Sequence, residues 1–561
     1  MRYAALLGVV LLGVVAWLSL RTARVERPNV LLVTIDTLRP DAVGSGTPAM
    51  DAFLATAARF PRTRTVAPLT LPSHVSMLTG LLPARHGIHD NVTAPLPADR
   101  PFPLLAEQFR DRGYSTAAFV ASSVLGTGTG LSQGFETYDA PAHDGAGEGQ
   151  AVPGDERVNA AITYLEGARG RPWFVWVHLF DPHAPYEVFP GDDRRAATRE
   201  GDPPYALYLG DVRRADAALG KLMAAAGEKT VVVLASDHGE SFGEHGEHTH
   251  GALCYGATAD TLLAIRAPGF AAGTSDAGLR SVADIAPTLR RLCGLPGAPS
   301  DGLDLGSAPH ETLVTESLFT WRVHGWGQCF AATDGVFTLV ETGPRLELFD
   351  RRADPGEEHP LPLAQRAYET LDRALERFRS GASVDRDGEL FVSLPAYGQA
   401  RRHVTGYLAR ADNGRLRDPA PHLGMWMAIE DMPWIVHRAL ERKDRAPLEA
   451  ALRMLDEISE ATPESPLVPY RRARVLEAMA QVTGEPSWLN GAAAAQLEAV
   501  EKGYDTGTAV EDAITTAVAA GDADVLKALA AFLRRDGRKI DPGTERAIAE
   551  AERAIAERKG Q

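Results

Sequence analysis

The sequence has few cysteines and no excess of positive charge. Its three cysteines, Cys254, Cys293 and Cys329, match neither the spacing of a zinc finger nor that of a small disulfide framework. Lysine and arginine number 58 against 74 acidic residues, giving a formal charge of −16. Binding to nucleic acid regardless of sequence is not expected, because it depends on neutralising phosphate charge. The length and the ordinary composition fit a globular protein of about two to four domains.

Long hydrophobic runs are also scarce, and the clearest one lies at the N-terminus. Ala4–Leu20 is almost unbroken, is flanked by arginines, and sits at the lower limit of length for spanning a bilayer. It lacks a small-x-small cleavage motif and a neighbouring cysteine, which favours an uncleaved signal anchor and excludes a lipoprotein anchor. We expect residues 1–27 to tether the protein to the cell envelope with the rest outside the cytoplasm. A cleaved signal peptide followed by secretion is the alternative.

Apolar strands and helices alternate through the first part of the chain. We expect strands at 29–35, 115–121, 173–179 and 230–236, and helices at 102–113, 156–167, 205–226 and 281–292. This alternation is typical of an α/β fold with a mostly parallel sheet covered by helices on both faces. Residues 311–350 contain short strands and turns instead, which predicts a small antiparallel subdomain.

The C-terminal part, from about residue 385, is rich in alanine, glutamate and arginine. Its pattern predicts helices at 446–461, 469–482, 492–502, 509–520, 523–535 and 544–558. Paired helices with short connections are typical of a helical-repeat solenoid. No cluster of histidine, aspartate or cysteine occurs there at ligand spacing. We therefore expect this part to bind a protein partner or the envelope and to carry out no chemistry.

Acidic residues and histidines follow three of the expected strands. Asp36 follows the first strand, Asp181 and His183 follow the third, and Asp237 and His238 follow the fourth. Ligands bind at the carboxyl ends of the strands in open α/β sheets. Oxygen ligands mixed with imidazole suit zinc, manganese or a similar divalent ion, although residues of these types also cap turns. The sequence does not decide between one ion and two.

The stretch TLPSHVSMLTG predicts a helix of about two turns that begins near Thr70 and ends at Gly80. The N-terminus of a helix favours an anion, because its backbone N–H groups are unpaired and its dipole is positive there. A hydroxyl at this point suits attack on phosphorus or sulfur once its pKa is lowered. The alternative is that Thr70 only caps the helix. Asn91 lies in the polar loop that follows and can face the same site.

Several motifs together resemble the sulfatase branch of the alkaline phosphatase superfamily. VLLVTIDTLRPD resembles its first metal strand, TLPSHVSMLTG its nucleophile motif, DPHAPY its His-x-Pro segment and SDHGE its second metal strand. The later stretches VADIAPTLRRLCGLP and LELFDRRADPGEE are similar to the family as well. The resemblance covers roughly residues 28–385 and implies an alkaline phosphatase-like catalytic domain with an antiparallel subdomain at 311–360. Residues 386–561 resemble the tetratricopeptide-like extensions of some bacterial members.

The departures from the family pattern concern the chemistry. Thr70 stands where sulfatases convert a cysteine or serine to formylglycine, and a secondary alcohol cannot give that aldehyde. His74 stands in place of the motif's arginine, Thr37 in place of the second acid, and His250 in place of a sulfate-binding lysine. The ligand set therefore combines imidazole with the oxygen ligands that calcium prefers, and this mixture favours zinc or manganese over calcium or magnesium. The resemblance implies catalytic roles for Thr70, His74, Asn91, His183 and His250, and metal ligation by Asp36, Thr70, Asp181, His183, Asp237, His238 and His250.

A threonine nucleophile is what the phosphodiesterase, phosphonate-hydrolase and phosphoethanolamine-transferase relatives use. We therefore expect a metal-dependent hydrolase or transferase of phosphoric esters (a phosphodiester, phosphomonoester or phosphonate) that forms a phospho-threonine at Thr70. The expected substrate is a small-molecule, lipid or glycan ester. A sulfuric ester hydrolase and a catalytically degenerate member that acts as a binding protein are the alternatives.

Overall fold

The computed structural model describes residues 27–91, 95–141, 151–168, 170–184, 186, 205–324, 326–363, 366–381, 423–430, 432–463, 465–502, 507–534 and 542–559. The apolar run Ala4–Leu20 lies outside these residues. Within them, no helix combines the length and the hydropathy that crossing a membrane requires.

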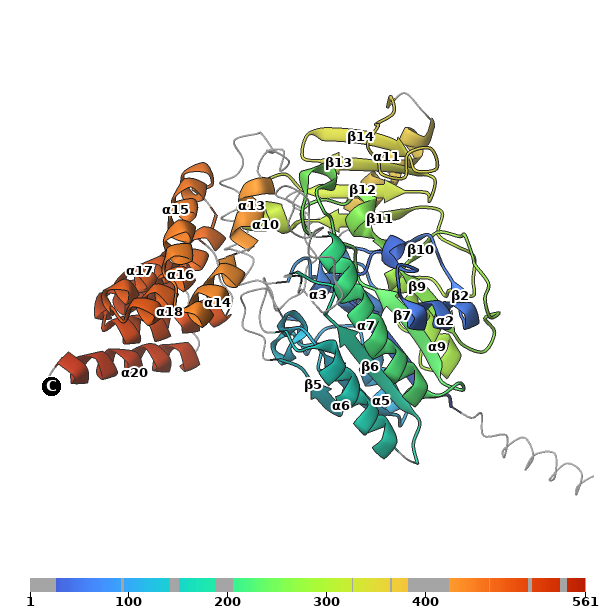
Figure 1. Cartoon of the computed structure of the whole chain (residues 1–561), viewed down its shortest axis with the longest axis horizontal. Coiled ribbons are helices and arrows are strands. Elements are labelled where there is room, and N and C mark those ends of the chain that lie inside the picture. Colours follow the sequence, from blue (N-terminus) through green and yellow to red (C-terminus); the bar gives the residue numbers. More distant parts are fainter. Residues whose placement is uncertain are drawn as a thin grey trace, which may run out of the picture.

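A seven-stranded sheet forms the centre of the N-terminal part (Figure 1). Its strand order is β2-β9-β7-β1-β6-β4-β5. The bounds are β1 Val30–Ile35, β2 Ala58–Arg59, β4 Ser115–Val120, β5 Thr137–Asp139, β6 Trp173–Leu179, β7 Val231–Ser236 and β9 Leu263–Arg266. Strands β7, β1, β6, β4 and β5 are parallel, whereas β9 and β2 pair antiparallel at one edge. The predicted mostly parallel sheet is confirmed.

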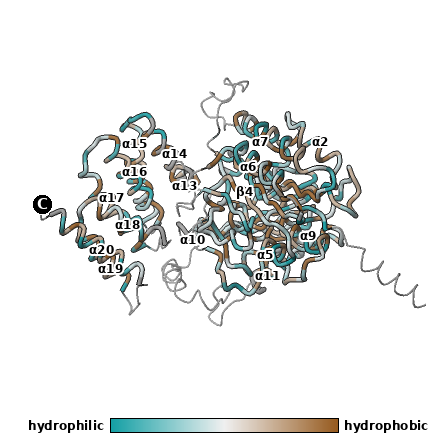
Figure 2. The backbone as a smooth tube through the Cα atoms, turned by 90° about the horizontal axis from the view of Figure 1, so that it is seen from below, coloured by the Kyte–Doolittle hydropathy of each residue, from teal (hydrophilic) through white to brown (hydrophobic). Residues whose placement is uncertain are grey.

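Helices cover both faces of this sheet because the central strands are apolar on both sides. In β1, Val30 and Leu32 pack into the cluster on one face, and Leu31 and Val33 into the cluster on the other. One face carries α3 Thr70–Thr79, α5 Leu105–Asp111 and α9 Ile285–Cys293; the other carries α2 Pro48–Thr56, α6 Gly154–Gly167 and α7 Tyr205–Ala226. Figure 2 shows hydrophobic segments gathered inside this layered part.

Short helices and two small sheets complete the N-terminal part. The short helices are α4 Pro83–His86, α8 Gly256–Ala259 and α10 Phe319–His324, and the 3-10 turns are η1 Pro40–Ala42, η2 Ser123–Leu125, η3 Thr127–Thr129, η4 Glu244–Gly246 and η5 Val282–Asp284. A three-stranded sheet joins β10 Arg280–Ser281, β3 Thr63–Arg64 and β8 Asp260–Thr261. An antiparallel sheet follows, with β11 Leu313–Ser317, β12 Cys329–Thr333, β13 Phe337–Thr342 and β14 Arg345–Asp350. It packs on α11 Arg366–Gly381, and it confirms the predicted antiparallel subdomain.

The C-terminal part is helical, as predicted. Its helices are α13 Leu423–Glu430, α14 Met432–Arg442, α15 Ala446–Ala461, α16 Leu467–Thr483, α17 Ser487–Glu501, α18 Gly507–Ala520, α19 Ala523–Leu533 and α20 Pro542–Lys559. Its likeness to tetratricopeptide repeats stays a prediction. One apolar cluster runs from these helices into the N-terminal part, joining Leu423 and Ile429 to Trp326 and Tyr255. Figures 1 and 2 both place α13 beside α10, between the two parts.

Two helices begin later than their periodicity indicates. The helix expected from residue 102 begins at Leu105, because the Glu107 carboxylate accepts the N–H of Leu104 and caps the helix there. The helix expected from residue 281 opens with a 3-10 turn, in which the side chain of Ser281 accepts the N–H of Ala283. Local capping bonds therefore move the boundaries without changing the element types.

Candidate active site

The ends of β1 and β7 bring two carboxylates together. The strands are adjacent and parallel, with Ile35 opposite Ser236, so Asp36 and Asp237 follow at the same edge of the sheet. His238 comes next, and all three side chains are fully buried. One ligand atom of each lies within 4.8 Å of those of the other two. These three side chains could together hold a metal ion at the position where the strand-end pattern predicts one.

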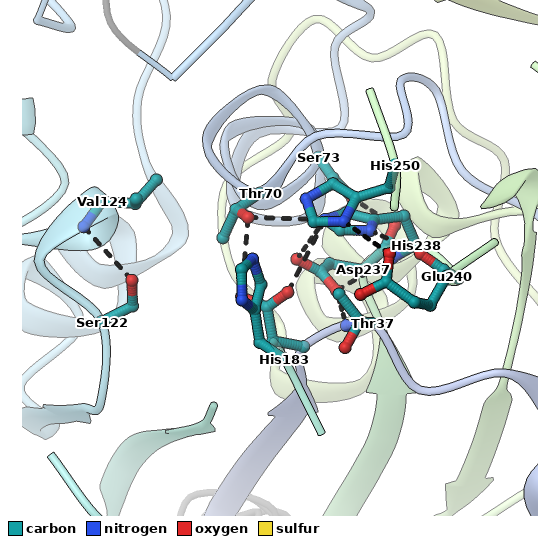
Figure 3. A network of polar contacts seen from close by, with 12 residues as sticks. Thr37, Thr70, Ser73, Ser122, Val124, His183, Asp237, His238, Glu240 and His250 are labelled. Atoms are coloured by element: carbon teal, nitrogen blue, oxygen red, sulfur yellow. Dashed lines mark hydrogen bonds and ion pairs between the residues drawn. The ribbon is translucent and has the colours of Figure 1, made fainter. Parts of the chain in front are cut away.

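Thr70 is the first residue of α3 and directs its hydroxyl into this cluster (Figure 3). Its Oγ1 lies 3.5 Å from Oδ2 of Asp36 and 3.4 Å from Nε2 of His238. The N-cap position of α3 is Leu69, and no side-chain bond caps the helix from there. The hydroxyl of Thr70 therefore faces the cluster instead of the helix N–H groups that a capping side chain binds.

Two bonds fix the N-terminus of α3 beside the cluster. Oδ1 of Asn91 accepts the backbone N–H of Leu71 at 2.9 Å, so Asn91 caps the helix from a distant loop. The hydroxyl of Ser73 donates to the backbone carbonyl of Asp237 at 2.8 Å and joins the helix to the loop after β7. Asn91 thus orients the helix that carries Thr70.

The protonation of His238 follows from its neighbours. Its Nδ1 lies 3.0 Å from the carbonyl oxygen of Gly239, which can only accept, so Nδ1 carries the proton. Burial, reinforced by His250, holds the pKa of His238 well below its usual value, so the ring is neutral at physiological pH. Its Nε2 lone pair consequently faces Thr70 and Oδ2 of Asp237, 3.4 Å away in each case.

The donor atoms of Asp36, Thr70, Asp237 and His238 approach one another at distances that ligands of one ion can adopt, with Asp36 facing His238 through Oδ1 and Thr70 through Oδ2. Ligand atoms about 2.0–2.2 Å from such an ion lie roughly 3.3–3.6 Å from one another. Nε2 of His238 is 3.4 Å from Oδ2 of Asp237 and 3.7 Å from Oδ1 of Asp36, and the two Thr70 contacts are 3.4 and 3.5 Å. Oδ1 of Asp36 and Oδ2 of Asp237 are buried with no hydrogen-bond partner, as expected of atoms reserved for a cation. The residues present therefore fit a divalent ion.

The two carboxylates titrate as a pair. For Asp36, burial raises the pKa, but the hydrogen bond from His178 and the neighbouring imidazoles outweigh it and bring the pKa below the usual value. For Asp237, burial and the charge of Asp36 raise the pKa well above the usual value. Without a cation the pair therefore tends to retain a proton, which an incoming divalent ion displaces.

His183 and His250 both lie close to Thr70, on different sides of it in Figure 3. The Nδ1 of His183 bonds to the carbonyl of Ala184, and the Nδ1 of His250 lies 3.0 Å from Oε1 of Glu240. Both acceptors hold a proton on Nδ1, so a ring that is neutral at either position carries its lone pair at Nε2. Burial lowers the pKa of His183, which keeps that ring neutral. Such lone pairs suit a cation or a proton-donating water better than a phosphoryl oxygen.

Asp181 lies apart from the cluster. Its Oδ1 is 3.0 Å from Nε of Arg214 and 3.4 Å from the backbone nitrogen of Gly154. Burial raises the pKa of Asp181, and Arg214 offsets part of this effect. Asp181 follows β6 at the same edge of the sheet as Asp36 and Asp237, but its carboxylate is bound by Arg214. We therefore leave Asp181 out of the ligand set.

The strand-end pattern in the sequence did not predict two residues that lie at the site. His178 lies inside β6 and Glu240 follows the Asp-His pair; both are fully buried. His178 approaches Asp36, with 3.3 Å between Nε2 and Oδ2. Glu240 binds His250 through Oε1 and accepts the hydroxyl of Tyr186 through Oε2 at 3.1 Å. The sequence feature that could have indicated His178 is a histidine inside the otherwise apolar run WFVWVHL.

Other polar residues near these loops have partners of their own. His245 stacks on Tyr255, with ring centroids 3.6 Å apart, and Ser122 accepts the N–H of Val124 within its own turn (Figure 3). Thr37 has a left-handed backbone, with φ of 53°, held by its N–H bond to Asp237 and by the Tyr208 hydroxyl. A strained turn of this kind keeps the end of β1 in one conformation.

Comparison with known proteins identifies similar molecules. Residues 28–295 match the family model described as Sulfatase. A sulfatase of Formosa agariphila is 23% identical over 449 residues, which cover 64% of this chain and 87% of that protein. Arylsulfatase A of Bos taurus is 27% identical over 444 residues, which cover 60% of this chain and 84% of that protein. The crystal structure of the phosphonate monoester hydrolase of Agrobacterium radiobacter superposes with a TM-score of 0.53 at 21% identity, covering 66% of this chain and all of that one.

Proposed function

Because residues 28–295 form a sulfatase-family domain, and such domains hydrolyse ester bonds, we propose that this protein is a metal-dependent hydrolase or transferase of phosphoric esters. Thr70 is its nucleophile, and a phospho-threonine is its intermediate. The observation that carries the proposal is the hydroxyl of Thr70, held 3.4 Å from His238 and 3.5 Å from Asp36. A threonine cannot become formylglycine, so a sulfatase-type aldehyde hydrate is excluded as the nucleophile.

Asp36, Thr70, Asp237 and His238 would hold the ion, with zinc or manganese favoured by the mixture of oxygen and imidazole donors. When bound, a divalent ion supplies Lewis acidity, which lowers the pKa of a bound hydroxyl toward neutrality. His183 and His250 present lone pairs that would hold a second ion or accept a proton.

The residues of the chain divide the reaction into two steps. In the first, Oγ1 of Thr70 loses its proton and forms a bond to phosphorus while the bond from phosphorus to the leaving oxygen breaks on the opposite side, and that oxygen takes up a proton to leave as an alcohol. The N-terminus of α3, fixed by Asn91, directs a positive dipole end toward the phosphoryl group. In the second step, the oxygen of water or of an acceptor alcohol forms a bond to phosphorus while the bond from phosphorus to Oγ1 of Thr70 breaks, and Thr70 regains its proton. Nε2 of His250, oriented by Glu240, is placed to take the proton of that nucleophile.

A sulfuric ester hydrolase is the second candidate, because two relatives that this chain resembles are described as sulfatases. Fold and family do not fix which ester is cleaved. The test compares turnover of aryl phosphate monoesters, aryl phosphate diesters and aryl phosphonates with that of an aryl sulfate, after loading with Zn²⁺ or Mn²⁺. Faster turnover of the sulfate would overturn the phosphoric ester assignment. Absence of any bound metal in protein purified without chelator would favour a degenerate binding protein.

We also place the enzyme outside the cytoplasm, tethered by residues 1–27, with a small-molecule, lipid or glycan ester as its substrate. The support is the apolar run Ala4–Leu20 with its arginine flanks. A fluorescent reporter or an alkaline phosphatase fused after Gln561 shows the side of the membrane. A cytoplasmic reading would overturn this location.

A further inference from the structure

Two buried imidazoles lie beneath the site and face no solvent. His74 lies one turn along α3 from Thr70, and His178 lies in β6; their exposed fractions are 1% and 0%. Their ring centroids are 5.0 Å apart with the planes at 75°, an edge-to-face contact. Each ring reaches a different side of the proposed nucleophile centre.

His74 belongs to a series of hydrogen bonds that joins Trp176 to the backbone of Thr70. The indole Nε1–H of Trp176 can only donate, and it donates to Oγ1 of Thr34 at 3.0 Å. The carbonyl of Thr70 can only accept, so neutral His74 carries its proton on Nδ1, and its Nε2 accepts the hydroxyl proton of Thr34 at 3.0 Å. The Nδ1–H of His74 then donates to the backbone carbonyl of Thr70 at 2.8 Å. This series of hydrogen bonds from Trp176 to Thr70 restrains the backbone at Thr70.

His178 contacts the other side of the centre. Its Nε2 lies 3.3 Å from Oδ2 of Asp36, the same oxygen that lies 3.5 Å from Oγ1 of Thr70. Among the described residues, neither ring nitrogen of His178 makes a further hydrogen bond. A fully buried imidazole with an unbonded nitrogen costs stability, so packing alone does not account for a histidine here.

A second ion between the two rings is the competing explanation, because His74, His178 and Asp237 also have ligand atoms within 4.8 Å of one another. Both nitrogens of His74 are already bonded, one to Thr70 and one to Thr34. Ligation by His74 would break the hydrogen-bond chain that holds Thr70. The geometry therefore favours orientation over metal binding.

We infer that His74 and His178 are positioning residues: His178 orients the carboxylate of Asp36 toward the ion, and His74 holds the backbone of Thr70. The inference rests on the proposed function, since both roles act through the nucleophile centre. Residues that orient metal ligands typically contribute about 10–100-fold to metal affinity or activity. Because the rings act on different partners, their substitution should have separable effects.

The test for His178 compares His178→Phe with His178→Gln in the full chain, by competition for Zn²⁺ against a chromophoric chelator and by thermal melting. We expect His178→Phe to lower Zn²⁺ affinity about 10–100-fold with an unchanged or higher Tm, and His178→Gln to stay within a few-fold of the parent. Glutamine keeps an N–H at the position of Nε2, whereas phenylalanine removes it. Unchanged Zn²⁺ affinity in His178→Phe would overturn the inference. If this variant fails to fold, the shorter His178→Asn replaces it in the comparison with His178→Gln.

The test for His74 compares His74→Leu with His74→Asn, whose amide nitrogen replaces Nδ1. We expect His74→Leu to lower kcat about 10–100-fold with KM and Zn²⁺ stoichiometry unchanged, and His74→Asn to recover much of the loss. Equal losses in both variants, or the loss of one Zn²⁺ equivalent in His74→Leu, would overturn the role. Parent protein that binds no Zn²⁺ and cleaves no phosphoric ester refutes the proposed function itself. Active parent protein with unaffected variants refutes only this inference.

Discussion

The hydroxyl oxygen of Thr70 lies 3.4 Å from Nε2 of His238, the ring nitrogen whose lone pair is left unbonded by the Nδ1–H bond to Gly239. A neutral imidazole and a hydroxyl at this separation, with two buried carboxylates beside them, have the spacing of adjacent ligands of one ion. The same atom would thus be both ligand and nucleophile.

Thr70→Ser and Thr70→Cys should separate a hydroxyl nucleophile from a formylglycine. Thr70→Ser keeps the hydroxyl and removes only a methyl group, so we expect phosphoric ester turnover to stay within about tenfold of the parent. Thr70→Cys should gain no sulfatase activity, because His74 stands where the modification motif has arginine. Turnover of aryl phosphodiesters and aryl sulfates by both variants, with peptide mass spectrometry for the aldehyde, checks this. Formylglycine in Thr70→Cys with new sulfate turnover would contradict it.

Asp237→Asn should stabilise the metal-free protein and abolish its response to metal. Because the pKa of Asp237 is raised in the fold, the folded state binds a proton more tightly than the unfolded state. Stability of the metal-free protein therefore falls as pH rises from about 4, the unfolded value, through the raised folded value. Asparagine removes this penalty. Melting at pH 8 with EDTA should give a higher Tm for Asp237→Asn, and Zn²⁺ should raise the Tm of the parent only. A Zn²⁺-induced rise in the variant equal to that of the parent would contradict the ligand assignment.

Asp181→Asn should leave metal affinity nearly unchanged, whereas Asp36→Asn should lower it at least tenfold. The carboxylate of Asp181 is held by Arg214 and by the backbone of Gly154, away from the cluster. Arg214 is partly exposed and keeps its ion pair with Asp211 in this variant, so we expect the protein to remain folded. Chelator competition with Zn²⁺ on both variants measures the difference. Equal losses of affinity would place Asp181 in the ligand set.

Glu240→Gln should lower kcat while metal affinity at the Asp237 cluster changes little. Glu240 binds His250 through Oε1 and Tyr186 through Oε2, so its removal frees the ring that we place near the attacking water. We expect a loss of about 10–100-fold, the range typical of residues that orient catalytic groups. Steady-state kinetics beside Zn²⁺ titration checks this. A parent-like kcat would show that the orientation of His250 is unimportant for the slow step.

Deletion of residues 386–561 should retain small-substrate turnover but lower the Tm by several degrees. The chemistry-bearing residues all precede α11, which supports retained turnover. Deletion exposes apolar surface on the catalytic part, because Leu423 and Ile429 share one apolar cluster with Trp326 and Tyr255. Melting and turnover of the purified truncation test both statements. Complete loss of turnover in a truncation that still melts cooperatively would assign the helical part a catalytic role.

Much of this arrangement is readable from sequence because parallel strands end at one edge. Asp36 and Asp237 each follow an apolar run, and the pairing of β1 with β7 then brings them together. Thr70 precedes a short stretch with helix signals, and α3 begins there. The sequence periods thus determine the elements and the edge at which the polar residues meet.

The remaining features depend on side-chain directions and distant partners that no local pattern encodes. Asp181 stands at a strand end like Asp36, but its carboxylate is bound by Arg214, which lies on a helix 33 positions later. His178 and Trp176 lie inside a strand, where an apolar run reads simply as core. Their polar contacts with Asp36 and Thr34 exist only because β6 pairs with β1.

The most direct test of the nucleophile is the kcat of metal-loaded Thr70→Ala for an aryl phosphodiester, measured beside its melting temperature. The account predicts a loss of several orders of magnitude in kcat at a Tm within a few degrees of the parent, because the alanine removes the attacking oxygen and little of the packing. If Thr70 only stabilised the helix end, the substitution would cost about 1 kcal/mol of stability and leave turnover nearly unchanged. Parent-like phosphodiester turnover by Thr70→Ala would contradict the central claim.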